Sequence, residues 1–133
     1  MRDRNQKYSE FSLARTPDRS CTLITLAHAD LRSPSIVQDL ERDFVRVLDD
    51  LQSPRVVVDF TEVTVAPTAI FGIILQFVRD AAERDVQVRL CSLAPPIRKA
   101  FELLNAKRLV DLHGSRRDAV LKPWNRRRWW PFG

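Results

Sequence analysis

Apolar residues recur along the chain with two different periods, and the periods separate strands from helices. Strict alternation, or a short run of β-branched residues, is typical of a strand. This criterion predicts strands over residues 8–15, 21–27, 55–60, 86–93 and 109–112. The first alternates only weakly and is expected at a sheet edge. The run RVVVDF at 55–60 is apolar on both faces, which is typical of a central strand.

Apolar positions three and four residues apart predict amphipathic helices between these strands. The helix over 36–51 follows Ser33 and Pro34, which resemble a cap and a first-turn residue. The stretch PTAIFGIILQFVRDAAER at 67–84 has a broad apolar stripe and a charged end. A third helix opens at Pro95 and Pro96 and stops at Asn105. A brief last helix over 116–121 follows the capping pair Ser115 and Asp118.

The order strand, helix, strand over 55–93 predicts a right-handed βαβ unit with parallel strands. The expected fold class is therefore α/β, with a mixed central sheet of four to five strands and about four helices packed on it. A length of 133 residues corresponds to one domain. We expect a polar N-terminal extension over 1–7, a domain over 8–121 and an appended segment over 122–133.

The net charge of +5 belongs to one end of the chain. Residues 114–133 contain six basic residues and one acidic residue, so the formal charges of the remaining residues sum to zero. A neutral body does not favour nucleic acid as a partner. No apolar run approaches the roughly 18 residues that span a bilayer, and residues 1–10 lack the apolar core of a signal peptide. We therefore expect a cytoplasmic protein.

The residues that usually carry catalysis or bind metals are few and scattered. Cys21 and Cys91 lie in strand-like runs without metal-ligand spacing, which indicates buried free thiols rather than a disulfide or zinc. His28 and His113 fit no nucleophilic triad and no metal motif. A glycine-rich phosphate loop is also missing from the sequence. The sequence thus predicts no enzyme, no metal site and no cofactor.

Two segments together resemble a known family. VVVDFTEVTVAPTAIFGIIL, followed by VQVRLCSLAPPIRKAFELLNAKRLVDL, is similar to the STAS domain family, the fold of bacterial anti-sigma factor antagonists. The resemblance covers about residues 8–121. It implies a non-catalytic, protein-binding regulatory module in a partner-switching pathway, with an anti-sigma factor of the kinase-like type as partner. The alternative is a STAS subunit of a membrane lipid or solute transport complex, with a transporter ATPase as partner.

The family's signature loop is degenerate in this chain. Pro67 occupies the position of the family's Asp, Thr68 that of the first Ser, and Ala69 that of the second Ser, the usual phosphoacceptor. Because alanine cannot be phosphorylated, the resemblance leaves Thr68 as the candidate phosphoacceptor. The alternative is that the Thr68 hydroxyl only caps the following helix.

The resemblance also places the partner-binding surface on this loop and the start of the helix. On this chain it comprises Pro67, Thr68, Ala69, Ile70 and Phe71. The alternative for Ile70 and Phe71 is packing in the core, since one helix cannot present all its apolar side chains outward.

The segment 122–133 has a composition that the resemblance does not explain. It contains all three tryptophans of the chain, interleaved with arginines: Trp124, Arg126, Arg127, Arg128, Trp129 and Trp130. Such a segment suits an anionic membrane surface, a nucleic acid or an acidic protein groove. The remaining alternative is that its aromatic rings fold back onto the sheet. The first option predicts a protein that is peripheral to the membrane, while the oligomeric state stays open.

Overall fold

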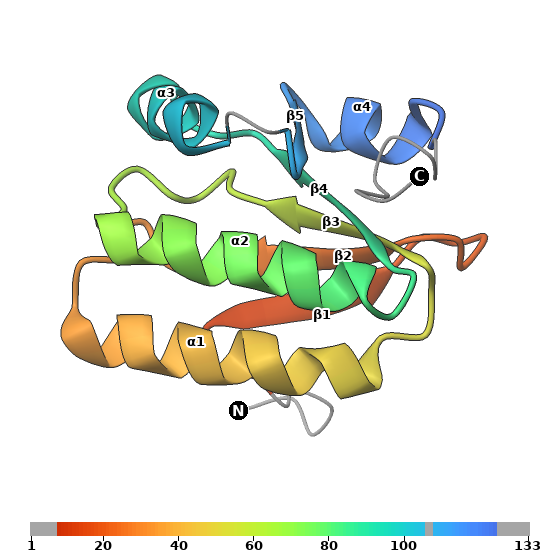
Figure 1. Ribbon diagram of the computed structural model, residues 1–133, viewed down its shortest axis with the longest axis horizontal. Helices are drawn as coiled ribbons and strands as arrows, with labels where there is room; N and C mark the ends of the chain where they lie inside the picture. The colour runs from red at the N-terminus through yellow and green to blue at the C-terminus, as the bar shows by residue number, and fades with distance from the viewer. Residues whose placement is uncertain (1–7, 106–107, 125–133) are drawn as a thin grey trace.

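The computed structural model describes residues 8–105 and 108–124. Five strands form a single sheet in chain order: β1 (Phe11–Arg15), β2 (Thr22–Leu26), β3 (Arg55–Asp59), β4 (Gln87–Cys91) and β5 (Asp111–His113). β1 pairs with β2 antiparallel, and the other neighbours pair parallel (Figure 1). The mixed sheet confirms the predicted α/β class and the parallel β3 and β4 expected of a βαβ unit.

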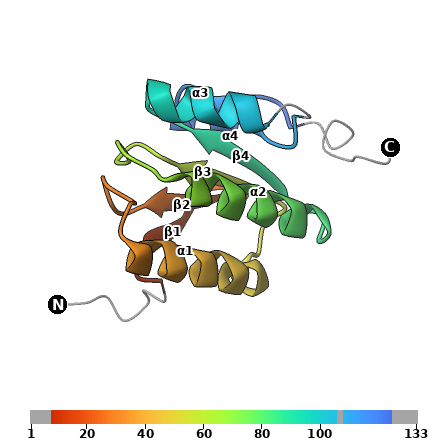
Figure 2. The same cartoon turned by 60° about the vertical axis from the view of Figure 1, so that its left-hand side comes forward.

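Four α-helices connect or follow the parallel strands: α1 (Pro34–Val47), α2 (Thr68–Ala82), α3 (Pro95–Leu104) and α4 (Arg116–Leu121). A short 3-10 helix, η1 (Leu48–Asp50), extends α1. α1 and α2 lie side by side on one face of the sheet (Figures 1 and 2). α4 contacts β3, β4 and β5 on the opposite face.

The larger core lies between the sheet and the helices α1, α2 and α3. Alternate strand residues point into it, as in the register pairs Val56 with Val88 and Val58 with Leu90. Phe101 of α3 joins this core through edge contacts with the rings of Phe60 and Phe71. Burying these side chains supplies most of the favourable free energy of folding.

A second, smaller core lies on the opposite face, under α4. Cys21, Val57, Cys91 and Ala119 are buried there, and Trp124 packs against them. Both cysteines are free thiols, as predicted. Burial raises the pKa of the Cys21 thiol to about 11 and that of the Cys91 thiol to about 12, so neither is a reactive thiolate at neutral pH.

Helix ends and one strand differ in detail from the sequence-based expectations. Ser115 does cap α4, since its Oγ accepts from the Asp118 N–H at 3.1 Å. Ser33 makes no side-chain cap for α1, although Pro34 begins the helix as expected. β5 starts later than predicted because both backbone groups of Val110 bind the side chain of Asn105, at 2.6 and 3.3 Å.

Candidate functional site

The loop between β3 and α2 lies at the carboxyl end of the parallel strands. It begins at the buried Asp59, whose Oδ1 accepts from the Thr61 N–H at 2.8 Å and from the Thr61 hydroxyl at 2.5 Å. Its Oδ2 accepts from Nε of Arg116 at 2.8 Å. Burial alone would raise the pKa of Asp59, but the hydrogen bonds from Thr61 and Arg116 outweigh it and hold the pKa below its usual value. An ionised Asp59 therefore fixes the start of the loop.

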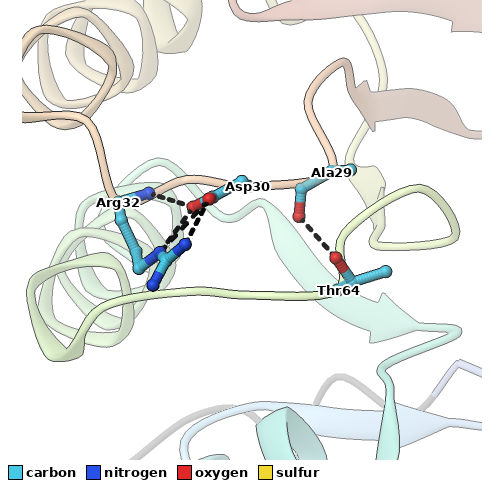
Figure 3. A network of polar contacts seen from close by, with 4 residues as sticks. All are labelled: Ala29, Asp30, Arg32 and Thr64. Atoms are coloured by element: carbon cyan, nitrogen blue, oxygen red, sulfur yellow. Dashed lines mark hydrogen bonds and ion pairs between the residues drawn. The ribbon is translucent and has the colours of Figure 1, made fainter.

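Backbone hydrogen bonds join this loop to the loop that precedes α1. The Ala29 carbonyl accepts from the N–H groups of Thr64 and Val65, at 2.8 and 3.1 Å, and from the Thr64 hydroxyl (Figure 3). The Leu31 N–H donates to the Val65 carbonyl at 2.9 Å. These bonds tie the two loops together just before α2 begins.

Asp30 and Arg32 form an exposed ion pair in the loop that precedes α1. Two nitrogens of the Arg32 guanidinium donate to the Asp30 carboxylate. The backbone N–H of Arg32 also donates to Oδ1 of Asp30, at 2.9 Å (Figure 3). The hydrogen bonds from Arg32 lower the pKa of Asp30 to about 2. Because both side chains are exposed, this ion pair adds little to the free energy of folding, and we attribute to it only the local ordering of the loop.

Thr68 is the first residue of α2, and its side chain is exposed. The N-cap is Pro67, and α2 has no side-chain cap. The expectation that the Thr68 hydroxyl caps this helix is therefore wrong. A residue inside the first turn directs its side chain away from the free N–H groups that an N-cap residue reaches. Thr68 and the exposed Ala69 thus face solvent at the start of α2.

Ile70 and Phe71 belong to the core and not to the surface of the loop. Ile70 is 1% exposed and Phe71 is 6% exposed. The ring of Phe71 lies 4.7 Å from that of Phe101, in an edge-to-face contact. Of the two alternatives, the structure selects core packing for both side chains. Neither can present an apolar surface to a partner without unfolding the first turn of α2.

A groove between α1 and α2 borders the exposed start of α2, and sequence periodicity did not reveal it. Its volume is about 460 Å³, and it runs from Ala69 and Gly72 toward Gln76 and Asp80. The other side is formed by residues of α1, namely Val37, Glu41, Phe44 and Val45. Nothing lies within 4 Å of a Cβ placed on Gly72, so the helix surface at this position faces open space. We refer to Thr68, Ala69 and Gly72, with this groove, as the loop face.

The smaller core holds the segment after α4 against the sheet. Arg89 of β4 is buried, and its guanidinium donates to the carbonyls of Ala119, Lys122 and Pro123, at 3.0, 2.7 and 2.5 Å. The guanidinium carbon lies 3.9 Å from the centre of the Trp124 ring. The indole N–H donates to the carbonyl of Val120 at 3.1 Å.

These contacts reach past residue 121, where the domain was expected to end. Residues 122–124 are part of the folded domain, and Trp124 folds back onto the sheet instead of extending from it. Arg126, Arg127, Arg128, Trp129 and Trp130 lie outside the described residues. The one sequence feature that could have indicated this packing is an arginine, Arg89, within the strand-like run VQVRLC.

Side chains that usually carry catalysis or bind metals form few clusters within residues 8–105 and 108–124. Within these ranges no group of three or more His, Cys, Asp or Glu side chains could hold a metal ion. His28 Nε2 lies 2.6 Å from an oxygen of the buried Glu10, which accounts for that histidine as a structural partner. Among the described helices, none is both long enough and apolar enough to cross a bilayer.

The family model for the STAS domain matches residues 35–119, from the start of α1 into α4. The chain belongs to the STAS domain family. No curated protein matches the chain by sequence.

Solved structures with the same fold include other members of this family. An anti-sigma factor antagonist (STAS) domain protein from Planctomyces limnophilus superposes with a TM-score of 0.71 at 15% identity, covering 85% of this chain and 97% of that one. A phosphorylated form of the Bacillus cell fate determinant SpoIIAA gives 0.60 at 15% identity, covering 83% and 96%. A serine-to-glutamate variant of RsbS from Moorella thermoacetica gives 0.66 at 10% identity, covering 84% and 92%. At such identities the likeness concerns the fold of this STAS domain.

Proposed function

We propose that this STAS domain is a non-catalytic regulatory module that binds a protein partner through its loop face, in the manner of an anti-sigma factor antagonist. One observation carries the proposal: Thr68, Ala69 and Gly72 are all exposed in the first turns of α2, beside an open groove. Small exposed side chains let another protein approach the helix closely. The rigid backbone before α2 lowers the entropy that such docking costs.

Thr68 is the residue of the loop face that a kinase could modify. Its hydroxyl is exposed in the first turn of α2, where the positive end of the helix dipole favours the negative charge of a phosphate. Phosphorylation would add nearly two negative charges to the loop face. This added charge would weaken the binding of a partner that contacts Ala69 and Gly72. The alternative, a domain with no phosphorylation switch, follows from Ala69 at the family's usual acceptor position.

A capture experiment tests the partner. The full chain is immobilised, proteins of the source organism are captured, and their identity is determined by mass spectrometry. Ala69→Arg should abolish capture of an anti-sigma factor of the kinase type. Ala14→Arg is the matched control because Ala14 is also an exposed alanine, on β1. Equal capture by both variants would remove the loop face from the proposal.

A second candidate function has a specific observation in its favour. The basic segment after α4 contains no acidic residue between Ala119 and Gly133. This charge suits a STAS subunit that works beside a membrane, in a lipid or solute transport complex. Capture of a transporter ATPase in the same experiment would support this candidate instead. Nucleic acid stays disfavoured because the rest of the chain is neutral.

A further inference from the structure

Exposed basic and apolar side chains lie together on the outer side of α4. Arg117 and Leu121 are four residues apart and therefore share one side of the helix. Leu121 is 65% exposed, and Arg117, Lys122 and Pro123 are also exposed. We refer to these four residues as the C-terminal patch. Arg116 does not contribute its charge, because it pairs with Asp59.

The buried Arg89 fixes the C-terminal patch to the domain. Its hydrogen bonds to the carbonyls of Lys122 and Pro123, and its stacking on Trp124, hold the backbone that follows α4. Asn125 follows Trp124 in the sequence, and the run of arginines and tryptophans comes directly after it. The chain therefore leaves the described domain beside an exposed leucine and two exposed cations.

Charge and apolarity together identify the kind of partner. Residues 117–133 contain five basic residues and one acidic residue, Asp118. An anionic lipid surface attracts such a cluster, and the boundary between headgroups and acyl chains accepts leucine and indole side chains. A nucleic acid would engage the cations and the indoles but would offer Leu121 no apolar surroundings. We propose that the C-terminal patch is a docking surface for anionic lipid membranes.

The patch and the loop face lie on opposite faces of the sheet, because α4 packs against one face and α2 against the other, and the chain that follows α4 also reaches the opposite end of β3. Thr68 follows the carboxyl end of β3, whereas the Trp124 ring lies 5.6 Å from the guanidinium carbon of Arg55, the first residue of β3. In Figure 1, the first turn of α2 is at the left and α4 is at the right. A domain bound to lipid through the patch therefore keeps its loop face turned toward solvent. This arrangement deepens the proposed function, because the partner and the membrane would be bound at the same time.

Sedimentation of the full chain with lipid vesicles tests the proposal. The probes are vesicles of phosphatidylcholine alone and of phosphatidylcholine mixed with phosphatidylglycerol in equal parts. We expect the chain to sediment only with the anionic vesicles, and salt to release it. Lys122→Gln should weaken binding about fivefold, and Leu121→Gln about tenfold. Both positions are exposed, so the variants keep the backbone contacts with Arg89.

Matched controls come from α3. Leu103 is 75% exposed and Lys99 is exposed, so Leu103→Gln and Lys99→Gln make the same chemical changes elsewhere. Neither should change sedimentation. The proposal is overturned if the full chain ignores anionic vesicles, or if the α3 variants weaken binding as much as the patch variants. Binding to a single-stranded oligonucleotide with the same sensitivity to Leu121→Gln would also overturn it. Ala69→Arg should leave sedimentation unchanged, which separates a failure here from a failure of the loop face.

Discussion

Removal of residues 122–133 should destabilise the domain, whereas removal of residues 125–133 should not. The longer deletion takes away two of the three carbonyls that accept from the Arg89 guanidinium, and it removes the Trp124 ring that the guanidinium stacks on. Arg89 stays behind in β4, where its side chain is buried. A buried cation that loses acceptors becomes costly, so the folded state is penalised.

The size of this effect follows from the lost contacts. A hydrogen bond to a charged group contributes about 1.5 to 3 kcal/mol, and a desolvated cation–π contact about 2 kcal/mol. Two such hydrogen bonds and the cation–π contact sum to about 5 to 8 kcal/mol, and water that reaches the vacated space offsets part of this loss. The expected loss is about 3 to 5 kcal/mol, which is a large fraction of the 5 to 15 kcal/mol that usually stabilises a domain.

Urea unfolding followed by circular dichroism measures the difference between the two deletions. Arg89→Met provides the control, because it replaces the buried charge with an apolar chain of similar length. In the chain that stops after Leu121, Arg89→Met should recover most of the lost stability. Equal unfolding free energies for the two deletions, or no recovery with Arg89→Met, would refute the assignment of residues 122–124 to the domain.

The remaining predictions concern the loop face, the smaller core and the response to acid. Gly72→Ala should raise the unfolding free energy by about 1 kcal/mol, because the site has open space and alanine favours a helix interior. Phe71→Asp should lower the unfolding free energy by more than about 4 kcal/mol, because it buries a charge. Thermal unfolding measures both changes. Cys21 and Cys91 should not react with a thiol reagent such as Ellman's reagent at pH 8 until the protein is denatured, because burial raises the pKa of both thiols; fast labelling of the native protein would contradict this. The pKa of Asp59 is lowered on folding, so its contribution to stability is complete above the unfolded pKa of about 3.9 and is lost as the pH falls through the lower folded value. Asp59→Asn should therefore flatten the acid limb of a plot of stability against pH, and an unchanged slope would show that Asp59 carries no such linkage.

Periodicity along the chain was enough to predict the elements and the fold class. The alternation at 22–26 and the β-branched run at 55–59 report strands because a strand directs successive side chains to opposite faces. The apolar steps in α1 report a helix for the equivalent reason. Prolines at the start of α1 and α3, and the Ser115 cap of α4, are local signals that need no distant partner. Such features depend on neighbours in the sequence, so the sequence alone determined them.

Tertiary structure decided which side chains of α2 are buried. Its apolar stripe is broad enough that periodicity could not rank Ile70 and Phe71, because rotating a helix by a small angle exchanges neighbouring positions. Contact with Phe101 of α3 settles the rotation and leaves Thr68 and Ala69 outside. The same contact determines that the small side chains of Thr68 and Ala69, and not those of Ile70 and Phe71, are exposed at the start of α2.

Long-range contacts also decided where the domain ends. Arg89 and Trp124 are far apart in the sequence, and nothing periodic links them. Only the assembled sheet places the guanidinium of Arg89 under the chain that follows α4, with its hydrogen bonds directed at three carbonyls. A cation that must be buried needs partners, and the fold supplies them from a segment that composition alone assigned to the tail.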